Sequence, residues 1–408
     1  MIATRLMTAA MAVAMVAAAP AASAQQPPPV VESSAPEAGT EPDEGFVDRV
    51  EDAADAFADR TQIVERLNGE IDGWYPRLGG MTRGSGFALG PGYRTHLLDN
   101  RLFVDLSAGI SIKGYKAADA NVRWLQAFDE RVEIWTDLRY EDFPQEDFFG
   151  LGLASSDTTR TSYDFGSADV AIRGLFMPTP RVRVGTSVGV LRPDIGRGTD
   201  SQFPSIEALF TDVEAPGLLD QPDFMHATVF GELDYRDVPG NPRSGGYHRA
   251  SFGIWDDVTL EQFDFKRFDM VLTEHVPLGA ARSHVLTGRL GTSYVNNETG
   301  ERVPFYFLAY VGGVDTIRSF REFRFKDENA LWLTAEYRWI PITWMSVATF
   351  IDAGKVTPDW HDVDVRGLKT GYGVGLRVHS RTQTFARLDV GTGGGEGWQI
   401  FLKLGPSF

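Results

Sequence analysis

The chain contains no cysteine in its 408 residues, which excludes disulfide bonds, thiolate metal ligands and cysteine nucleophiles. Histidine is also scarce, and no two histidines stand four residues apart, the spacing that places a metal-binding pair on one face of a helix. The seven histidines are His96, His226, His248, His275, His284, His361 and His379. We therefore predict no metal site and no cofactor.

Basic residues are fewer than acidic residues. Lysine and arginine together number 39 against 56 aspartates and glutamates, which gives a formal net charge of −17 at pH 7. Binding a phosphate backbone requires a basic face on the protein. Nucleic acid is therefore not an expected partner.

Long apolar runs are confined to the first 24 residues. Beyond them, no segment approaches the roughly 18–20 consecutive apolar residues that a membrane-spanning helix needs. The N-terminal segment has one positive charge at Arg5, an apolar stretch over 7–19, and the small residues Ala22, Ser23 and Ala24, which is typical of a secretory signal peptide. We expect cleavage after Ala24 and export through the general secretory pathway. The remaining chain would then carry a charge of 38 − 56 = −18.

From about residue 72 onward, apolar and polar residues alternate in short segments separated by turns. In the segment 131–141, for example, Val132, Ile134 and Tyr140 alternate with charged residues. A period of two indicates a strand with one apolar and one polar face. Such strands can cross a membrane when they close into a barrel whose outer face meets lipid and whose inner face meets water.

Fifteen alternating segments are clear, and we expect a sixteenth around 72–80. The fifteen are 84–97, 102–115, 118–128, 131–141, 160–176, 181–192, 226–237, 247–257, 264–276, 283–297, 330–340, 345–355, 370–380, 384–391 and 397–408. A barrel with both ends in the periplasm needs an even number of strands, and short periplasmic turns must alternate with longer external loops. The sequence therefore predicts an all-β fold, a sixteen-stranded antiparallel transmembrane β-barrel over 72–408 in the outer membrane; fourteen strands are the alternative.

The final segment is the expected closing strand. Ile400, Leu402 and Leu404 alternate with more polar residues after Trp398, and the chain stops on the aromatic Phe408 in the same phase. A last strand of this kind leaves a sheet edge open unless the sheet closes on itself. We interpret these five residues as the C-terminal strand signal of a barrel.

Two further segments precede the barrel. Residues 25–42 are rich in proline, serine, alanine and glutamate, which predicts a disordered leader. Over 43–70, apolar residues such as Phe46, Val50 and Phe57 recur mostly at three- and four-residue steps, which predicts a short amphipathic helix on the periplasmic side. This helix either docks at the barrel or serves as a spacer.

The long connection 298–329 carries a recognisable motif, Gly312-Gly313 followed by Ile317-Arg318-Ser319-Phe320. At these residues the sequence resembles the BamA/TamA superfamily of outer-membrane barrels, also called bacterial surface antigens. Their hallmark is a Gly-Gly segment before a Val/Ile-Arg-Gly-Phe/Tyr tip. The resemblance implies that the loop folds back into the lumen and that Arg318 pairs with acidic residues of the inner wall. Ser319 replaces the usual glycine, so its backbone is less free to adopt a positive φ.

The two strands after this loop offer suitable carboxylates. Alternation within 330–340 and 345–355 places Glu336 and Asp352 on the inward, polar phase. Because the two strands are consecutive, both carboxylates share one patch of wall, and a guanidinium with five donors can bridge them. We predict that Arg318, Glu336 and Asp352 form a structural lock that pins the loop. The alternative is that both carboxylates are ordinary charges of a wetted lumen.

Other features bear on membership and chemistry. The hairpin 234–246 resembles a periplasmic turn of the same superfamily. After cleavage, only about fifty residues precede the first strand, too few for the POTRA domains of well-studied members. A G-x-S-x-G match surrounds Ser187 but lies inside an alternating strand, where the strand-to-helix turn of a nucleophile elbow has no room. We therefore predict a stand-alone barrel without POTRA domains and without enzymatic activity.

Two function classes remain. The resemblance implies outer-membrane biogenesis or maintenance, by insertion or translocation of protein or lipid through a weak seam between the first and last strands. The alternative is a passive or gated outer-membrane channel, because a sixteen-stranded barrel can hold a water-filled lumen. Expected partners are outer-membrane lipid including lipopolysaccharide, the barrel assembly machinery that inserts the chain, and an unidentified periplasmic protein.

Overall fold

The computed structural model describes residues 71–79, 81–82, 85–127, 131–280, 282–297 and 301–404. The chain divides into two compact units, Met1–Ile71 and Asp72–Phe408, and the second unit is the barrel. The predicted signal peptide (1–24), leader (25–42) and amphipathic helix (43–70) lie outside the described residues, as does Phe408. No helix within the described ranges is long and apolar enough to cross a membrane.

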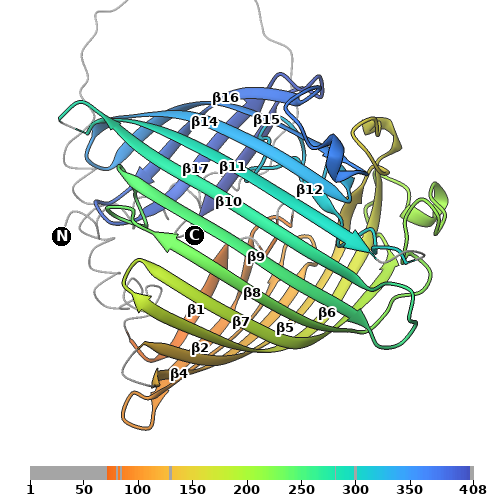
Figure 1. Cartoon of the computed structure of the whole chain (residues 1–408), viewed down its shortest axis with the longest axis horizontal. Helices are drawn as coiled ribbons and strands as arrows, with labels where there is room; N and C mark the ends of the chain where they lie inside the picture. Colours follow the sequence, from red (N-terminus) through yellow and green to blue (C-terminus); the bar gives the residue numbers. More distant parts are fainter. Residues whose placement is uncertain are drawn as a thin grey trace, which may run out of the picture. The chain divides into compact units, whose positions relative to one another are not determined.

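Sixteen antiparallel strands form a single sheet in which neighbours along the chain are neighbours in space, and the sheet curls into a barrel (Figure 1). A separate two-stranded sheet, β12 with β13, lies in the connection between β11 and β14. The strands are β1 (Gly73–Gly79), β2 (Ala88–Leu97), β3 (Leu102–Ser111), β4 (Lys116–Ala127), β5 (Val132–Phe148), β6 (Thr161–Thr179), β7 (Val182–Arg197), β8 (Phe224–Asp234), β9 (Gly245–Asp257), β10 (Phe265–Leu278), β11 (His284–Asn297), β12 (Ala309–Val311), β13 (Phe325–Asp327), β14 (Asn329–Ile342), β15 (Met345–Thr357), β16 (Lys369–His379), β17 (Thr384–Thr392) and β18 (Gln399–Leu404).

The predicted fold class is confirmed, and the count is sixteen rather than fourteen. Every predicted segment corresponds to one strand of the barrel, including the poorly defined first one, which is β1. The prediction was wrong mainly at the external ends of β5 and β7, which run to Phe148 and Arg197 instead of ending near 141 and 192. These extensions carry many polar residues, so they lack the lipid-facing alternation, yet their backbones still pair with β6.

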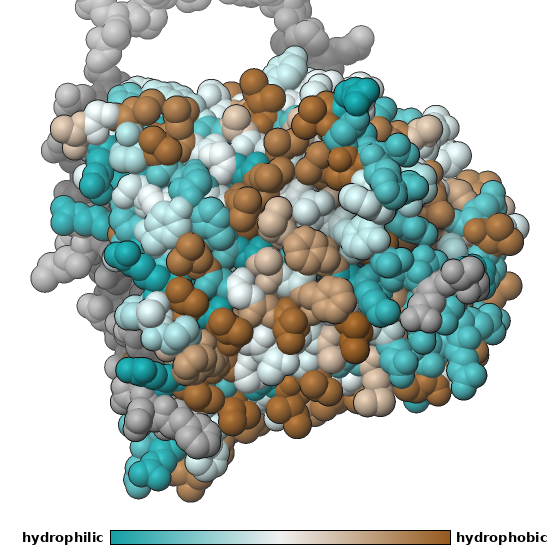
Figure 2. Space-filling view, viewed as in Figure 1, coloured by the Kyte–Doolittle hydropathy of each residue, from teal (hydrophilic) through white to brown (hydrophobic). Residues whose placement is uncertain are grey.

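The alternation has the expected physical consequence on each wall. On β5, Ile134, Leu138 and Tyr140 are exposed on the outer surface, while Arg139 points inward and pairs with Asp119 across the ladder at 3.0 Å. Figure 2 shows apolar side chains gathered over the face that carries β8 to β11, to which the exposed residues Phe252, Ile254, Val276 and Leu286 belong. An apolar exterior around a charged interior is the arrangement that lipid outside and water inside require.

Connections alternate in length around the barrel. Those of β2–β3, β6–β7 and β14–β15 span only a few residues, whereas those of β7–β8 and β11–β14 span tens of residues. Short turns are periplasmic and long loops external in outer-membrane barrels. The external loops are packed rather than loose, because an aromatic core joins Phe148 and Tyr163 at the strand ends to Ile206 and Phe305 in the loops.

Candidate functional site

The connection between β11 and β14 folds back against the inside of the barrel wall. Its apolar side chains pack with residues that β14 and β15 contribute, and the resulting cluster contains Ala309, Val311, Ile317, Phe320, Phe325, Ala330, Trp332 and Val356. The small β12–β13 sheet stiffens the two limbs of the loop through its own antiparallel ladder. The loop tip is therefore held at the wall by apolar packing before any charge is considered.

The two glycines of the motif shape the tip. Gly312 and Gly313 adopt φ angles of 116° and 98°, a region that side chains with a Cβ rarely enter. A Cβ on Gly312 would lie 2.3 Å from the carbonyl oxygen of Arg321, so the position also lacks space. The turn is closed by Thr316, whose hydroxyl accepts the Gly312 N–H at 2.8 Å, and by the Gly313 N–H, which donates to the Phe320 carbonyl at 3.1 Å.

Ser319 accommodates its departure from glycine without backbone strain. It is not among the described residues with a positive φ, so the expected need for left-handed backbone does not arise. The Ser319 side chain instead faces Gly371 of β16, where an added Cβ would meet the Ser319 hydroxyl at 1.8 Å. A glycine on the wall thus provides the room that a glycine at the tip would otherwise provide.

Arg318 lies at the centre of the site, and its side chain is only 2% exposed. It binds Asp352 in a bidentate manner, with Nε donating to Oδ2 and Nη2 donating to Oδ1, both at 2.8 Å. The backbone N–H of Arg318 donates to the same carboxylate at 3.0 Å, and Nη1 donates to Glu336 Oε2 at 2.7 Å. The guanidinium also stacks on Phe350, 3.4 Å from the ring centroid, while Thr334 donates to Asp352 Oδ1 at 2.9 Å. The structure thus brings together the three residues predicted to form a lock.

The network is larger than the sequence prediction. Arg377 on β16 reaches both Glu336, at 3.1 Å, and Asp389 on β17, at 2.8 Å. Arg387 pairs with Asp389 at 2.5 Å, and Arg318 lies 3.8 Å from the same carboxylate. The alternation that placed Glu336 inward also places Arg377, Arg387 and Asp389 inward, so their facing could have been predicted from the sequence, although their contacts could not. Three cations and three carboxylates balance in a buried cluster, which is the condition for keeping such charges in the interior.

The cluster favours the charged form of Arg318. Burial alone would lower the pKa of the Arg318 guanidinium, but the hydrogen bond and charge of Asp352, with the charges of Glu336 and Asp389, raise that pKa above its ordinary value. The arginine therefore stays charged at every physiological pH. The arrangement can hold a loop, and within the described residues no group of three or more His, Cys, Asp or Glu side chains could hold a metal ion.

A second arginine of the folded-back connection between β11 and β14, which we call the plug loop, links it to the external loops. Arg324, which is 3% exposed, donates from Nε to Glu396 Oε1 at 2.6 Å and from Nη2 to the Ser155 carbonyl at 2.8 Å. Glu396 lies in the connection that leads into β18, and Ser155 lies in the connection between β5 and β6. Arg324 stands four residues after the loop motif, but the sequence does not indicate its partners, because both lie in loops without periodicity.

The periplasmic hairpin between β8 and β9 does more than turn the chain. Gly240 at its tip bridges to Gln383 in the turn between β16 and β17, and the Gly240 carbonyl accepts the Thr384 N–H at 3.0 Å. Asn241 is buried and donates to the Ser380 carbonyl at 2.9 Å. Its amide also contacts His379 at 3.2 Å, which accounts for that inward histidine as a polar partner.

Backbone amides fix the conformation of this hairpin. The Asp237 carboxylate accepts the N–H groups of Val238, Arg243 and Ser244 at 2.9–3.1 Å. Partial burial would raise the pKa of the Asp237 carboxyl, but these backbone hydrogen bonds lower it below its ordinary value. The hairpin is thus a rigid bridge from β8–β9 to β16–β17, strands that are separated in the sheet by β10, β11, β14 and β15.

We expect Asn241→Ala to loosen this bridge. Removing the amide takes away its hydrogen bond to the Ser380 carbonyl and its contact with His379, a loss of about 1–3 kcal/mol. Trypsin cleavage after Arg243 should accelerate in the folded barrel, whereas Asn296→Ala, at an exposed position on β11, should leave the cleavage rate unchanged. Equal rates in both variants would mean that the hairpin is held by its backbone alone.

Ser187 does not form a nucleophile elbow. It lies within β7 and pairs in register with Arg173 of β6 and Thr228 of β8, so its backbone is extended strand on both sides. Of the residues predicted to form a C-terminal strand signal, Trp398, Ile400 and Leu402 are exposed on the outer surface. Leu404 ends β18.

Comparison with known proteins agrees with this geometry. Residues 155–393 match the model of the Omp85 superfamily domain. Among solved structures, BamA from Haemophilus ducreyi lacking POTRA domains 1–3 superposes with a TM-score of 0.61 at 12% identity, covering 82% of this chain and 70% of that one. CdiB from Escherichia coli gives a TM-score of 0.50 at 11% identity, covering 82% of this chain and 60% of that one. At these identities the structural matches establish the fold alone. Among curated proteins, none matches this sequence.

Proposed function

This chain belongs to the Omp85 superfamily of outer-membrane barrels, and from that premise we propose that it inserts or translocates protein or lipid through a seam between β1 and β18. Its role would be outer-membrane biogenesis or maintenance. Barrels of this superfamily are generally not enzymes, and the proposal requires no catalytic step. We take its partners to be outer-membrane lipid including lipopolysaccharide, the assembly machinery that inserts it, and a separate periplasmic protein, after export directed by residues 1–24.

The state of the seam carries this proposal. Every other pair of neighbouring strands is joined by a hydrogen-bonded ladder, but among the described residues none joins β1 to β18. Both strands are short: β1 has seven residues and β18 has six in the described part, against nineteen for β6. Because no ladder joins β1 to β18 in the described part, opening between them breaks fewer backbone hydrogen bonds than separating two strands that are paired.

The approach to β18 supports the same reading. Gly393, Gly395 and Gly397 all adopt positive φ, and a Cβ on Gly395 or Gly397 would meet no atom within 4 Å. The chain is sterically unconfined at Gly395 and Gly397, next to the last strand, while Gly393 and Gly394 pack against Tyr372 and Phe320. Movement of the last strand is therefore easiest at Gly395 and Gly397. Arg324 contacts this segment through Glu396, so the plug loop and the strand next to the seam are mechanically connected.

A gated channel remains the second candidate, favoured by one specific observation. The plug loop covers the inner face of β14 to β17, while inward charges on β1, β4 and β5 stay accessible to water. Arg77 and Asp119 each have side chains that are 30% exposed, and Arg139 is 57% exposed. A polar, partly open lumen beside the plug would conduct small ions.

Locking the seam tests the main proposal, and a chain without cysteine is well suited to it. We would pair Trp74→Cys or Pro76→Cys in β1 with Leu402→Cys in β18 and oxidise the purified barrel in proteoliposomes. Insertion of an unfolded outer-membrane barrel precursor is expected to fall by about tenfold, a barrier increase of about 1.4 kcal/mol, and to recover on reduction.

The matched control links two strands that are already laddered. Ala250→Cys with Met270→Cys joins β9 to β10 at residues that are partners in register, and its oxidation should leave insertion unchanged. Full insertion by a cross-linked seam would contradict the proposal and leave the channel as the better account.

A further inference from the structure

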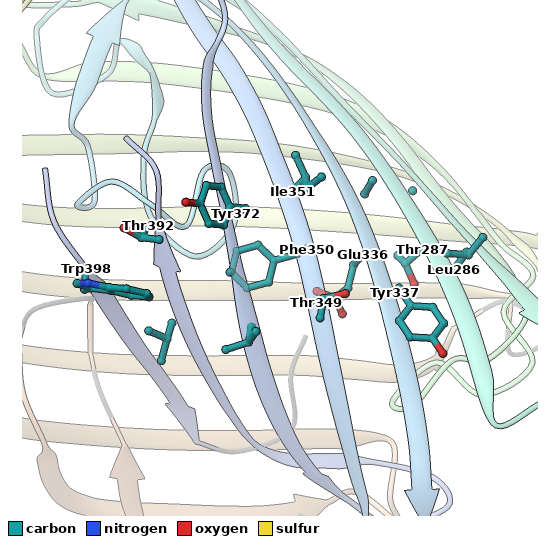
Figure 3. A pocket seen from close by; sticks show the side chains of 15 residues that line it. Leu286, Thr287, Glu336, Tyr337, Thr349, Phe350, Ile351, Tyr372, Thr392 and Trp398 are labelled. Atoms are coloured by element: carbon teal, nitrogen blue, oxygen red, sulfur yellow. The ribbon is translucent and has the colours of Figure 1, made fainter. Parts of the chain in front are cut away.

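A groove of about 730 Å³ crosses the outer wall of the barrel close to the last strand. Its lining comes from β11, β14, β15, β16 and β17, with Trp398 at the start of the final strand (Figure 3). The outward-facing members of this lining are almost entirely apolar, and the groove lies within the membrane-facing surface. We refer to this feature as the wall groove.

Small residues on neighbouring strands create the concavity. Gly288 of β11 lies opposite Ala335 of β14 in the ladder, and Thr349 of β15 lies opposite Tyr337, two residues further along β14. A Cβ placed on Gly288 would meet no atom within 4 Å, which shows how open the floor is. Larger side chains form the walls, namely Leu286, Tyr337, Ile351, Tyr372, Val374 and Trp398.

The two ends of the wall groove differ in chemistry. At the end nearer the periplasm, the Tyr337 hydroxyl is tethered to His284 Nδ1 at 2.6 Å, and the two rings stack with an interplanar angle of 18°. At the other end, Tyr372 follows the external connection into β16 and Trp398 precedes β18; these side chains are 59% and 70% exposed. Tyr and Trp with one apolar and one polar edge are typical of the membrane–water interface. The groove is therefore closed below by a fixed ring and opens toward the outer leaflet.

We propose that the wall groove binds one acyl chain of lipopolysaccharide from the outer leaflet. Lipid tails surround this surface in the membrane, and the open end faces the leaflet that lipopolysaccharide occupies. The hydrophobic effect cannot hold the chain there, because neighbouring lipid is equally apolar. Shape does so, since a concave site with rigid walls gives a chain more dispersion contacts than a flat barrel face. The volume is in the roughly 300–1,000 Å³ range of small-molecule sites.

The wall groove is separated from the Arg318 cluster by the thickness of one sheet. Ala335 and Ile351 face the groove, and their chain neighbours Glu336 and Phe350 face the lumen, where they bind Arg318 by an ion pair of 2.7 Å and a ring contact of 3.4 Å. A bound acyl chain would thus contact the same segments of β14 and β15 that hold the plug loop. This places a lipid site beside the seam, on the strands that anchor the plug.

Two outward-facing glycines allow a matched test. Gly288→Phe puts a ring into the wall groove, whereas Gly231→Phe puts the same ring on β8, away from the groove; a Cβ at either position meets no atom within 4 Å. An aromatic residue on a lipid-facing strand favours strand structure, so both variants should fold. Ile351→Ala serves as a third variant, because it removes one wall without adding volume.

The measurement is native mass spectrometry of the purified full-length barrel titrated with rough-type lipopolysaccharide in detergent. Wild type and Gly231→Phe should each retain one tightly bound molecule. Gly288→Phe should bind it about tenfold more weakly, a difference of about 1.4 kcal/mol, and Ile351→Ala should also bind more weakly than wild type. Heat-modifiable migration in gels reports folding of each variant.

Each other outcome is decisive. Equal affinity in Gly288→Phe and Gly231→Phe would overturn the site. Retention of phospholipid with no preference for lipopolysaccharide would overturn the assigned ligand. The inference rests on the proposed partnership with lipopolysaccharide and names its site. Lipid occupancy is measured without any insertion assay, so failure of the site leaves insertion through the seam standing, and failure of insertion leaves the site standing.

Discussion

Replacing Arg318 with alanine is expected to release the plug loop from the barrel wall while the barrel itself stays inserted. Asp352, which is 0% exposed, would lose two side-chain hydrogen bonds, and Glu336 would lose one. Removing one partner of a buried ion pair typically costs about 3–5 kcal/mol, because the remaining charge is left unpaired. Trypsin cleavage after Arg324, which is 3% exposed in the folded protein, should therefore increase at least about a hundredfold.

Two companion variants separate charge from geometry. Arg318→Lys retains a cation but cannot form the bidentate contact with Asp352, so its cleavage rate should lie between those of wild type and Arg318→Ala. Arg366→Ala removes an arginine that is 90% exposed and pairs with Asp364 in another external loop, where a surface ion pair contributes little. Cleavage after Arg324 in Arg318→Ala at the wild-type rate would show that apolar packing alone holds the loop.

Deleting residues 312–325 is expected to change conduction more than any point substitution. Wild-type barrels in planar bilayers should give small, flickering openings, because the loop packs against β14 and β15 and narrows the lumen. Without the segment, a sixteen-stranded barrel has an interior wide enough for an aqueous channel. Openings should then become large and stable, by about an order of magnitude in conductance.

The control shortens an external loop that contributes no residue to the Arg318 cluster or to the apolar packing of the plug loop. Removing residues 361–366 from the connection between β15 and β16 should leave the wild-type pattern intact. Large, steady openings in the wild type itself would identify a porin, and the channel would replace insertion as the proposed function. Together with seam cross-linking, the recordings distinguish a plugged barrel that opens sideways from a pore that opens along its axis.

The sequence by itself determined the sixteen strands and the side of the wall on which each residue lies. Both follow from a local rule: in a strand between lipid and water, successive side chains must face opposite solvents. That rule identified β1 by parity and placed Glu336 and Asp352 in the lumen before any contact was known. With the loop motif, it was enough to predict the two carboxylates that hydrogen-bond to the Arg318 side chain.

Only the tertiary structure decided which residues of different strands, and which residues of different loops, contact one another. Arg377 and Asp389 join the cluster because the register of β16 against β17 and the curvature of the wall aim them at Glu336 and Arg318. The contact of Asn241 with Ser380, 139 residues apart, and the pairing of Arg324 with Glu396 connect loops that carry no periodic signal. The wall groove likewise forms only where small residues of adjacent strands, such as Gly288 and Ala335, lie opposite each other in the ladder. Alternation specifies on which side of the wall a residue lies. These contacts depend in addition on the register of each strand against the next around the barrel, and no local sequence pattern encodes that register.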